Sequence, residues 1–124
     1  MSTWTAEELD KIGSADELDI AALRPDGSLR PYTTIWVVRV GDDLYVRSYR
    51  GRNSGWFRSV LRRPEGRIRA GGVDREVAFT EPDGADGAAI DQAYRAKYTR
   101  FGNAYVDPML ARDATAATLR LDAR

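Results

Sequence analysis

The feature that most constrains the fold is an apolar run at residues 32–40. Its β-branched and aromatic residues predict a long strand, and the polar turn at 41–43 is followed by a second strand at 44–49. Residues 35–38 are all apolar, so both faces of the first strand need cover. This suits a barrel wall covered outside by a helix or by another subunit. The central strand of a monomeric sandwich would satisfy the same pattern.

Other segments read as shorter strands. Alternating apolar residues predict a strand at 18–23, and a hairpin at 66–70 and 75–80 turns through 71–74. A last strand is expected at 115–121.

Helices are expected between these strands. Thr5 and Glu8 form a capping box for a short N-terminal helix ending near Gly13, with Trp4 stapled onto Leu9. A helix at 54–63 follows the central hairpin.

A longer helix is expected before the last strand, with apolar residues from Ile90 to Phe101, Asp86 as its cap and Gly102 as its stop. Asp107-Pro108 opens one further turn. A chain of 124 residues in this order predicts one α+β, mostly β domain over residues 1–124, closed into a small barrel that hides its strand edges.

Composition excludes several kinds of chemistry. The chain has no cysteine and no histidine, which removes thiolate catalysis, Ser-His-Asp triads and the commonest metal ligands. We therefore expect no metal site. The formal net charge is zero, and no apolar stretch is long enough to cross a membrane, so the expected location is cytoplasmic.

The segment 49–56 carries the strongest functional signal. Arg50 and Arg52 flank Gly51, which turns the backbone, and Asn53 and Ser54 are suited to accept from the amides of a helix first turn. Remaining amides and the helix dipole favour an anion, and arginine suits phosphate.

Trp56 follows about one turn into the helix and offers a surface on which a ring could stack. Together with the anion site, it points to a ligand that bears both a phosphate and a ring. An ordinary helix start with solvated arginines is the alternative.

These residues resemble the flavin-binding split-barrel superfamily, and within it the deazaflavin-dependent nitroreductases. The shared motif is a basic residue, an Asn and a Trp three positions later, here Arg52, Asn53 and Trp56. A Gly/Ser/basic turn at 27–30 is similar too. The run from 36 to 51 followed by GRIRAGG looks like the bacterial family of unknown function numbered 2255, and the resemblance covers roughly residues 18–80.

The resemblance implies a homodimer with a flavin-type cofactor at the subunit interface. Arg52 would hold the phosphate, Asn53 and Ser54 would open the helix, and Arg50 and Arg30 are further candidates. Ser54 replaces the usual Pro, and Asp26 adds negative charge near the turn. We therefore expect flavin mononucleotide (FMN) rather than the highly charged deazaflavin coenzyme, and absence of a cofactor stays an alternative.

The implied activity is hydride transfer to a small organic substrate, an oxidoreductase reaction. Tyr32 and Tyr49 are the nearest candidate proton donors, and the pattern identifies no catalytic residue. Two other classes remain open: a cofactor-free module that binds a small molecule or a partner, and a platform for single-stranded nucleic acid built on residues 36, 45, 49 and 56. Zero net charge argues against nucleic acid.

Overall fold

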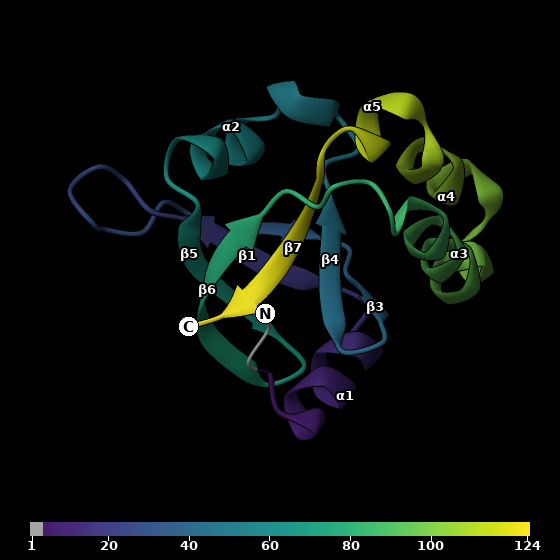
Figure 1. Ribbon diagram of the computed structural model, residues 1–124, viewed down its shortest axis with the longest axis horizontal. Coiled ribbons are helices and arrows are strands. Elements are labelled where there is room, and N and C mark those ends of the chain that lie inside the picture. The colour runs from purple at the N-terminus through teal and green to yellow at the C-terminus, as the bar shows by residue number, and fades with distance from the viewer. Residues whose placement is uncertain (1–3) are drawn as a thin grey trace.

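A computed structural model describes residues 4–124, and one curled sheet dominates it (Figure 1). Its helical elements are α1 (Ala6–Ser14), η1 (Gly51–Asn53), α2 (Gly55–Arg62), α3 (Gly87–Tyr98), η2 (Thr99–Phe101), α4 (Asn103–Leu110) and α5 (Arg112–Thr115). Its strands are β1 (Leu18–Ala22), β2 (Thr33–Ile35), β3 (Val38–Val40), β4 (Asp43–Arg47), β5 (Glu65–Ala70), β6 (Val73–Thr80) and β7 (Thr118–Ala123).

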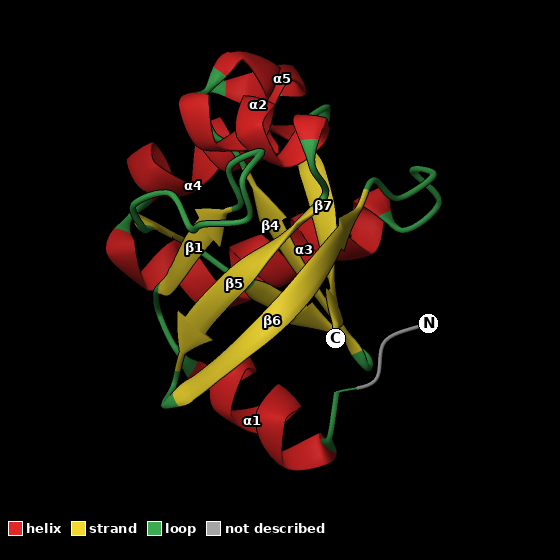
Figure 2. Cartoon of the chain, turned by 90° about the vertical axis from the view of Figure 1, so that its left-hand side faces the viewer, coloured by secondary structure: helices red, strands yellow, loops and turns green. Residues whose placement is uncertain are grey.

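The seven strands form one antiparallel sheet in the order β2-β1-β5-β6-β7-β4-β3. β2 and β3 lie at opposite edges, although only Trp36 and Val37 separate them along the chain. The sheet must therefore curl until its two edges nearly meet, which confirms the expected small barrel. α1 covers one end of this barrel and α2 the other (Figure 2). α3 and α4 pack beside β3 and β4 (Figure 1).

The expectation of one continuous strand at 32–40 is wrong, because its two halves pair with different neighbours. β2 pairs with β1 and β3 pairs with β4, so the ladder breaks between them. At the break, the hydroxyl of Tyr98 accepts from the amide of Val37 at 3.1 Å, and the ammonium of Lys97 donates to the carbonyl of Val37 at 2.7 Å. Trp36 stacks flat on Tyr98, with ring centroids 3.8 Å apart. Trp36 and Val37 are thus covered by α3 of the same chain.

Two hydrophobic cores hold the fold together. The larger fills the barrel and contains Leu18, Val46, Phe57, Ile68 and Leu119, among others. A second core lies between the outer face of the sheet and the helices; it contains Val38, Tyr45, Ile90, Tyr94 and Tyr98, among others. α3 and α4 are therefore attached to the barrel by apolar contact, which fixes the wall they form beside the site described below.

The capping box of α1 is confirmed. The amide of Glu8 donates to Thr5 Oγ1 at 3.1 Å, and the amide of Thr5 donates to a carboxylate oxygen of Glu8 at 3.0 Å. The helix ends at Ser14, one residue beyond the expected end. Trp4 is buried in the larger core together with Leu9, as the staple requires.

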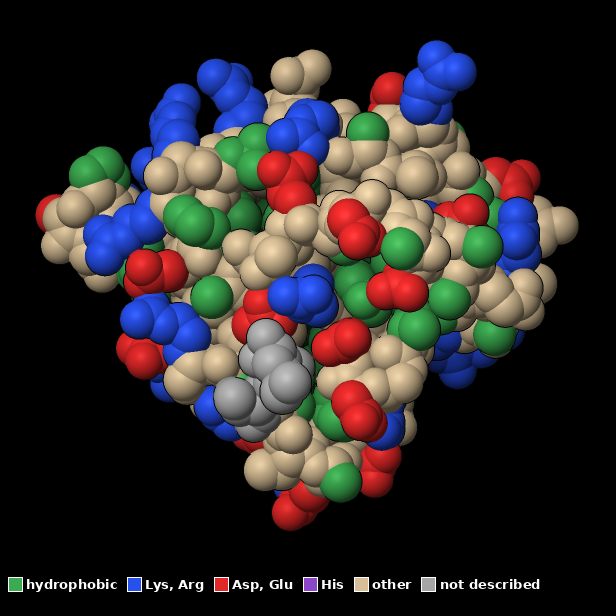
Figure 3. Space-filling view, in the orientation of Figure 1, with side chains coloured by type: hydrophobic (Ala, Val, Ile, Leu, Met, Phe, Trp, Pro, Cys, Tyr) green, Lys and Arg blue, Asp and Glu red, His purple; other side chains and the backbone are tan. Residues whose placement is uncertain are grey.

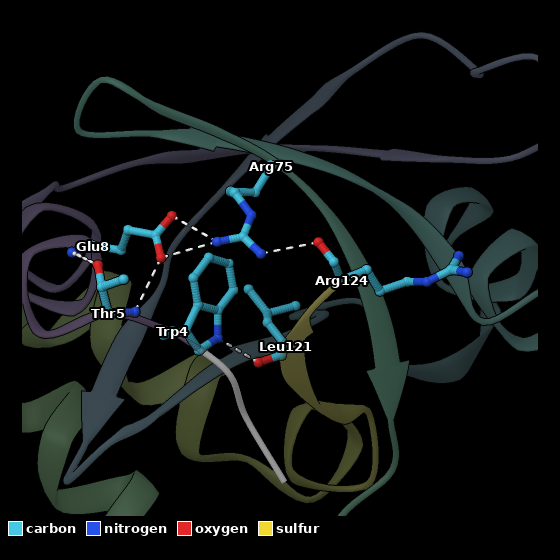
Figure 4. A network of polar contacts seen from close by, with 6 residues as sticks. All are labelled: Trp4, Thr5, Glu8, Arg75, Leu121 and Arg124. Atoms are coloured by element: carbon cyan, nitrogen blue, oxygen red, sulfur yellow. Dashed lines mark hydrogen bonds and ion pairs between the residues drawn. The ribbon is translucent and has the colours of Figure 1, made fainter.

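The same Glu8 ties the N-terminal segment to the end of the chain (Figure 4). Arg75 donates to both carboxylate oxygens of Glu8 and to the carbonyl of Arg124, and its guanidinium lies over the ring of Trp4. Trp4 Nε1 donates to the carbonyl of Leu121 at 2.9 Å. Hydrogen bonds from the Thr5 amide and from Arg75 lower the pKa of Glu8 below its ordinary value.

Four details differ from the sequence-based expectations. Residues 112–115 form α5, so the last strand starts at Thr118 and runs to Ala123. The hairpin turn is confined to the two positive-φ glycines 71 and 72, which lets β6 start at Val73. Asp86 stands at the N-cap of α3 without a capping hydrogen bond; its carboxylate accepts instead from the hydroxyl of Tyr45. Asp107-Pro108 lies inside α4 rather than opening it.

Candidate functional site

A groove of about 1090 Å³ runs past the start of α2. One side is formed by β2 and Trp36, another by α4, and its inner wall by the end of β4 and the loop that follows. Its lining residues are Thr33, Thr34, Ile35, Trp36, Arg47, Ser48, Tyr49, Arg50, Asn53, Ser54, Gly55, Trp56, Ala104, Tyr105, Pro108 and Met109.

The chain enters α2 through a tight turn. Gly51 has φ 79°, a conformation that favours glycine, and a Cβ there would lie in tight contact with the Cβ of Asp113 on α5, 3.2 Å away. Contrary to expectation, neither Asn53 nor Ser54 caps the helix. Ser54 Oγ accepts instead from Ser48 Oγ at 2.8 Å. The first-turn amides of α2 thus have no side-chain cap. The start of the helix, where its dipole is positive, lies at the groove, because Ser54, Gly55 and Trp56 line it.

The two arginines of this loop lie in different surroundings. Arg50 is exposed, lines the groove and donates from Nε to the hydroxyl of Tyr49 at 2.8 Å, with no ion pair to a described acid. Arg52 is outside the groove lining and donates to both carboxylate oxygens of Glu81 and to the carbonyl of Ala116. Of the two, Arg50 is the cation available to a ligand in the groove.

The other predicted residues divide in the same way. Asn53, Ser54 and Trp56 line the groove, and Trp56 is half-buried, edge-on to Phe57. Arg30 does not line the groove; its Nε is buried and has no hydrogen-bond partner among the described residues. The structure therefore brings together four of the six predicted residues: Arg50, Asn53, Ser54 and Trp56.

Sequence reasoning missed Arg47, which forms part of the inner wall. Its side chain is fully buried, and Nη1 donates to Asp91 at 2.6 Å and to the carbonyl of Met109 at 2.9 Å. Nε donates to Thr118 Oγ1 at 3.0 Å, and the guanidinium lies 5.3 Å from the ring centre of Tyr94. Nη2 is buried without a hydrogen-bond partner. A buried charged donor that keeps one unused hydrogen-bonding position is expected to meet a ligand or water.

The candidate proton donors are also separated. Tyr49 lines the groove and is 58% exposed, whereas Tyr32 lies outside it beneath the guanidinium of Arg69. Tyr45 is buried against Asp86, and burial raises its pKa to about 12. The four-aromatic platform considered for nucleic acid is thus reduced to Trp36, Tyr49 and Trp56, because Tyr45 is buried and cannot reach a base.

No cluster of metal-ligating side chains exists within residues 4–124. Among the helices of that described range, none has the length and apolar character needed to span a bilayer.

Comparison with known proteins identifies a family. The family model described as "Uncharacterized protein conserved in bacteria (DUF2255)" matches residues 8–121. None of the curated proteins matches the chain.

Solved structures share the fold at low identity. A putative pyridoxamine 5'-phosphate oxidase from Listeria innocua is 13% identical over 95% of this chain and 91% of that one, with a TM-score of 0.65. HutZ, the heme storage protein from Vibrio cholerae, is 14% identical over 100% and 92%, with a TM-score of 0.63. A FAD-binding protein from Mesorhizobium loti is 17% identical over 98% and 91%, with a TM-score of 0.57. These matches confirm the split-barrel fold.

Proposed function

The chain belongs to the DUF2255 family, and from that premise we propose that its groove binds a flavin-type cofactor, FMN first, for hydride transfer to a small organic substrate. The observation that carries the proposal is one groove that joins an uncapped helix start, an unpaired Arg50 and the buried donor of Arg47. Its volume is sufficient for a mononucleotide, since ligand sites of such size are typically about 300–1,000 Å³.

Phosphate would be held at the start of α2. Arg50 can turn from Tyr49 to a phosphate without breaking an ion pair, and Asn53 and Ser54 add polar groups beside the helix amides. Arg52 would have to leave Glu81 first. This refines the expectation that Arg52 takes the phosphate: Arg50 becomes the first candidate.

The ring system would lie along the apolar part of the groove. Trp36 and Trp56 present aromatic surface there, and Met109 and Pro108 of α4 close the opposite side. Arg47 offers its unused Nη2 as a donor to a polar edge of the ring. A bound flavin supplies the hydride chemistry, and this chain's residues hold and orient it.

A matched pair of variants tests the phosphate site. We expect Arg50→Gln to weaken FMN binding by about 1.5–3 kcal/mol, roughly ten- to a hundredfold, the value of one charge-assisted hydrogen bond. Arg52→Gln should bind FMN like wild type. Quenching of tryptophan fluorescence and calorimetry would measure both, and riboflavin, which lacks the phosphate, should bind the wild type and both variants alike. If Arg52→Gln lost more FMN affinity than Arg50→Gln, Arg52 would be the residue that binds the phosphate.

The first experiment is the visible absorption spectrum of the purified protein, followed by titration with FMN, FAD, the deazaflavin coenzyme and hemin. Hemin is included because of the HutZ fold match, although the chain lacks His and Cys, two common haem ligands. Absence of a visible band and of quenching by any of the four would favour a cofactor-free binding module.

We further propose a homodimer in which a second copy covers the open side of the groove. Tyr105, on α4, lines the groove and remains 66% exposed, so its ring is available for contact with a second copy. Light scattering should give twice the 13.8 kDa chain mass at micromolar concentration. A monomer with undiminished FMN affinity would contradict the shared site.

A further inference from the structure

Six of the nine basic side chains that form no ion pair with a described acid gather on one face, around α2 and the turn at residues 24–30; the other three, Arg95, Lys97 and Arg112, lie on α3 and α5. This basic face consists of Arg24, Arg30, Arg50, Arg58, Arg62 and Arg63. Figure 3 shows basic side chains over α2 at the top and beside the turn at residues 24–30, which protrudes at the left. Most other arginines are neutralised locally, so the zero net charge of the chain conceals a segregated positive surface.

Contacts within the face join its two parts. Arg63 Nη1, at the end of α2, donates to the carbonyls of Arg24 and Pro25, which brings the helix beside the turn. Arg58 and Arg62 are exposed, and their spacing of four residues puts them on the same side of α2. No acid occurs between residues 47 and 64; Asp26, in the turn, is hydrogen-bonded to Ser28.

The chemistry of the face favours a chain of phosphates. Every cation is arginine, whose planar fork suits phosphate oxygens. At the groove end, exposed Tyr49 lies beside Arg50 and can receive a stacked base. An anionic membrane fits less well, because Phe57 and Val60, the apolar side of α2, are buried in the core and only Leu61 projects, 39% exposed.

We propose that the basic face binds single-stranded nucleic acid, with phosphates on Arg58, Arg62 and Arg63 and a base on Tyr49. The acids elsewhere on the molecule do not forbid this, since charges farther apart than about 8 Å are largely screened at physiological salt. Its phosphate contacts can be tested separately from the cofactor, because Tyr49 lines the groove but Arg58 and Arg62 do not.

The test is fluorescence anisotropy of a labelled 12-residue oligothymidylate. The variant Arg58→Gln/Arg62→Gln is compared with Arg95→Gln/Arg112→Gln, which removes two other exposed arginines without ion pairs and makes the same change in net charge. Loss of two phosphate contacts should weaken binding at least tenfold and reduce the slope of log K against log salt by about 1.4. The control pair should bind like wild type.

Several outcomes would overturn the proposal: no binding by wild type, equal loss in both double variants, or tighter binding of a duplex of the same length. Tighter binding of polyglutamate, or of vesicles containing phosphatidylserine, would reassign the face to an acidic protein or a membrane. FMN titration of the same variants should show unchanged affinity, so failure here leaves the cofactor proposal standing, and the reverse also holds.

Discussion

The buried pair of Arg47 and Asp91 gives the sharpest test of how this fold is held together. We expect Asp91→Asn to destabilise the protein strongly, because the Arg47 guanidinium would remain buried with its charge uncompensated. The chain offers a matched control in Arg39 and Asp10. Both pairs have an N–O distance of 2.6 Å, but the side chains are 0% and 29% exposed in the first pair and 32% and 73% in the second.

Burial should therefore decide the size of the effect. Removing one partner of a buried pair costs about 3–5 kcal/mol, and we expect about 3 kcal/mol for Asp91→Asn because Asp91 keeps some contact with water. Asp10→Asn should cost less than about 1 kcal/mol. The first value is a large part of the roughly 5–15 kcal/mol by which domains are stable.

Urea unfolding at pH 7 measures both free energies. Added salt should reduce the effect of Asp10→Asn and leave that of Asp91→Asn nearly unchanged, since buried pairs are poorly screened. Equal losses in the two variants would refute the reasoning. Because Arg47 also binds the carbonyl of Met109, Asp91→Asn should loosen α4 and weaken ligand binding in the groove.

Three further predictions concern the helix ends. Thr5→Ala should cost about 1 kcal/mol in urea unfolding through loss of the α1 cap, and a cost of zero would contradict the capping role. The pKa of Glu8 is lowered in the folded protein, so its carboxylate stabilises the fold at pH values above the ordinary pKa of 4.5, and this contribution is lost as pH falls. Glu8→Gln should therefore be less stable than wild type at pH 7, and the difference should shrink below about pH 4.5. A difference that does not change with pH would argue against this role. Burial lowers the pKa of Lys97 from 10.5 to about 8, so between pH 8 and 10 the unfolded state binds more protons than the folded state. Wild type should therefore gain stability relative to Lys97→Met as pH rises from 8 to 10. Parallel plots of unfolding free energy against pH for the two proteins would contradict this.

Local pattern was sufficient to predict most of the fold. The capping box at Thr5, the strand at 18–22 and the helix at 55–62 follow from side-chain chemistry within a few residues. The break at Trp36 and Val37 does not, because it depends on which distant strands pair with each half of the run. α5 was missed for a related reason: its four residues are too short to show a helical period.

The site shows the same division. Arg50 and Arg52 both belong to the predicted anion loop, but the turn at Gly51 leaves Arg50 by the groove while Arg52 pairs with Glu81, twenty-nine residues away. Their spacing along the chain does not predict which of the two arginines lies at the groove and which forms the ion pair. Arg47 did carry a signal, since it is a charge directly after three apolar residues of the strand, Leu44 to Val46, and such a residue is kept in a core only when it is paired.

The two-residue gap between β2 and β3 has a consequence for the order of folding. The backbone of Val37 can find its partners only when Tyr98 and Lys97 arrive from sixty and more residues later. The barrel seam therefore closes through contacts of high sequence separation, which slow the crossing of the folding barrier. Until α3 docks, the amide and carbonyl of Val37 bond only to water, and β2 and β3 remain the two unjoined edges of an open sheet. In hydrogen exchange, the Val37 amide should report the undocking of that helix rather than the fraying of either strand.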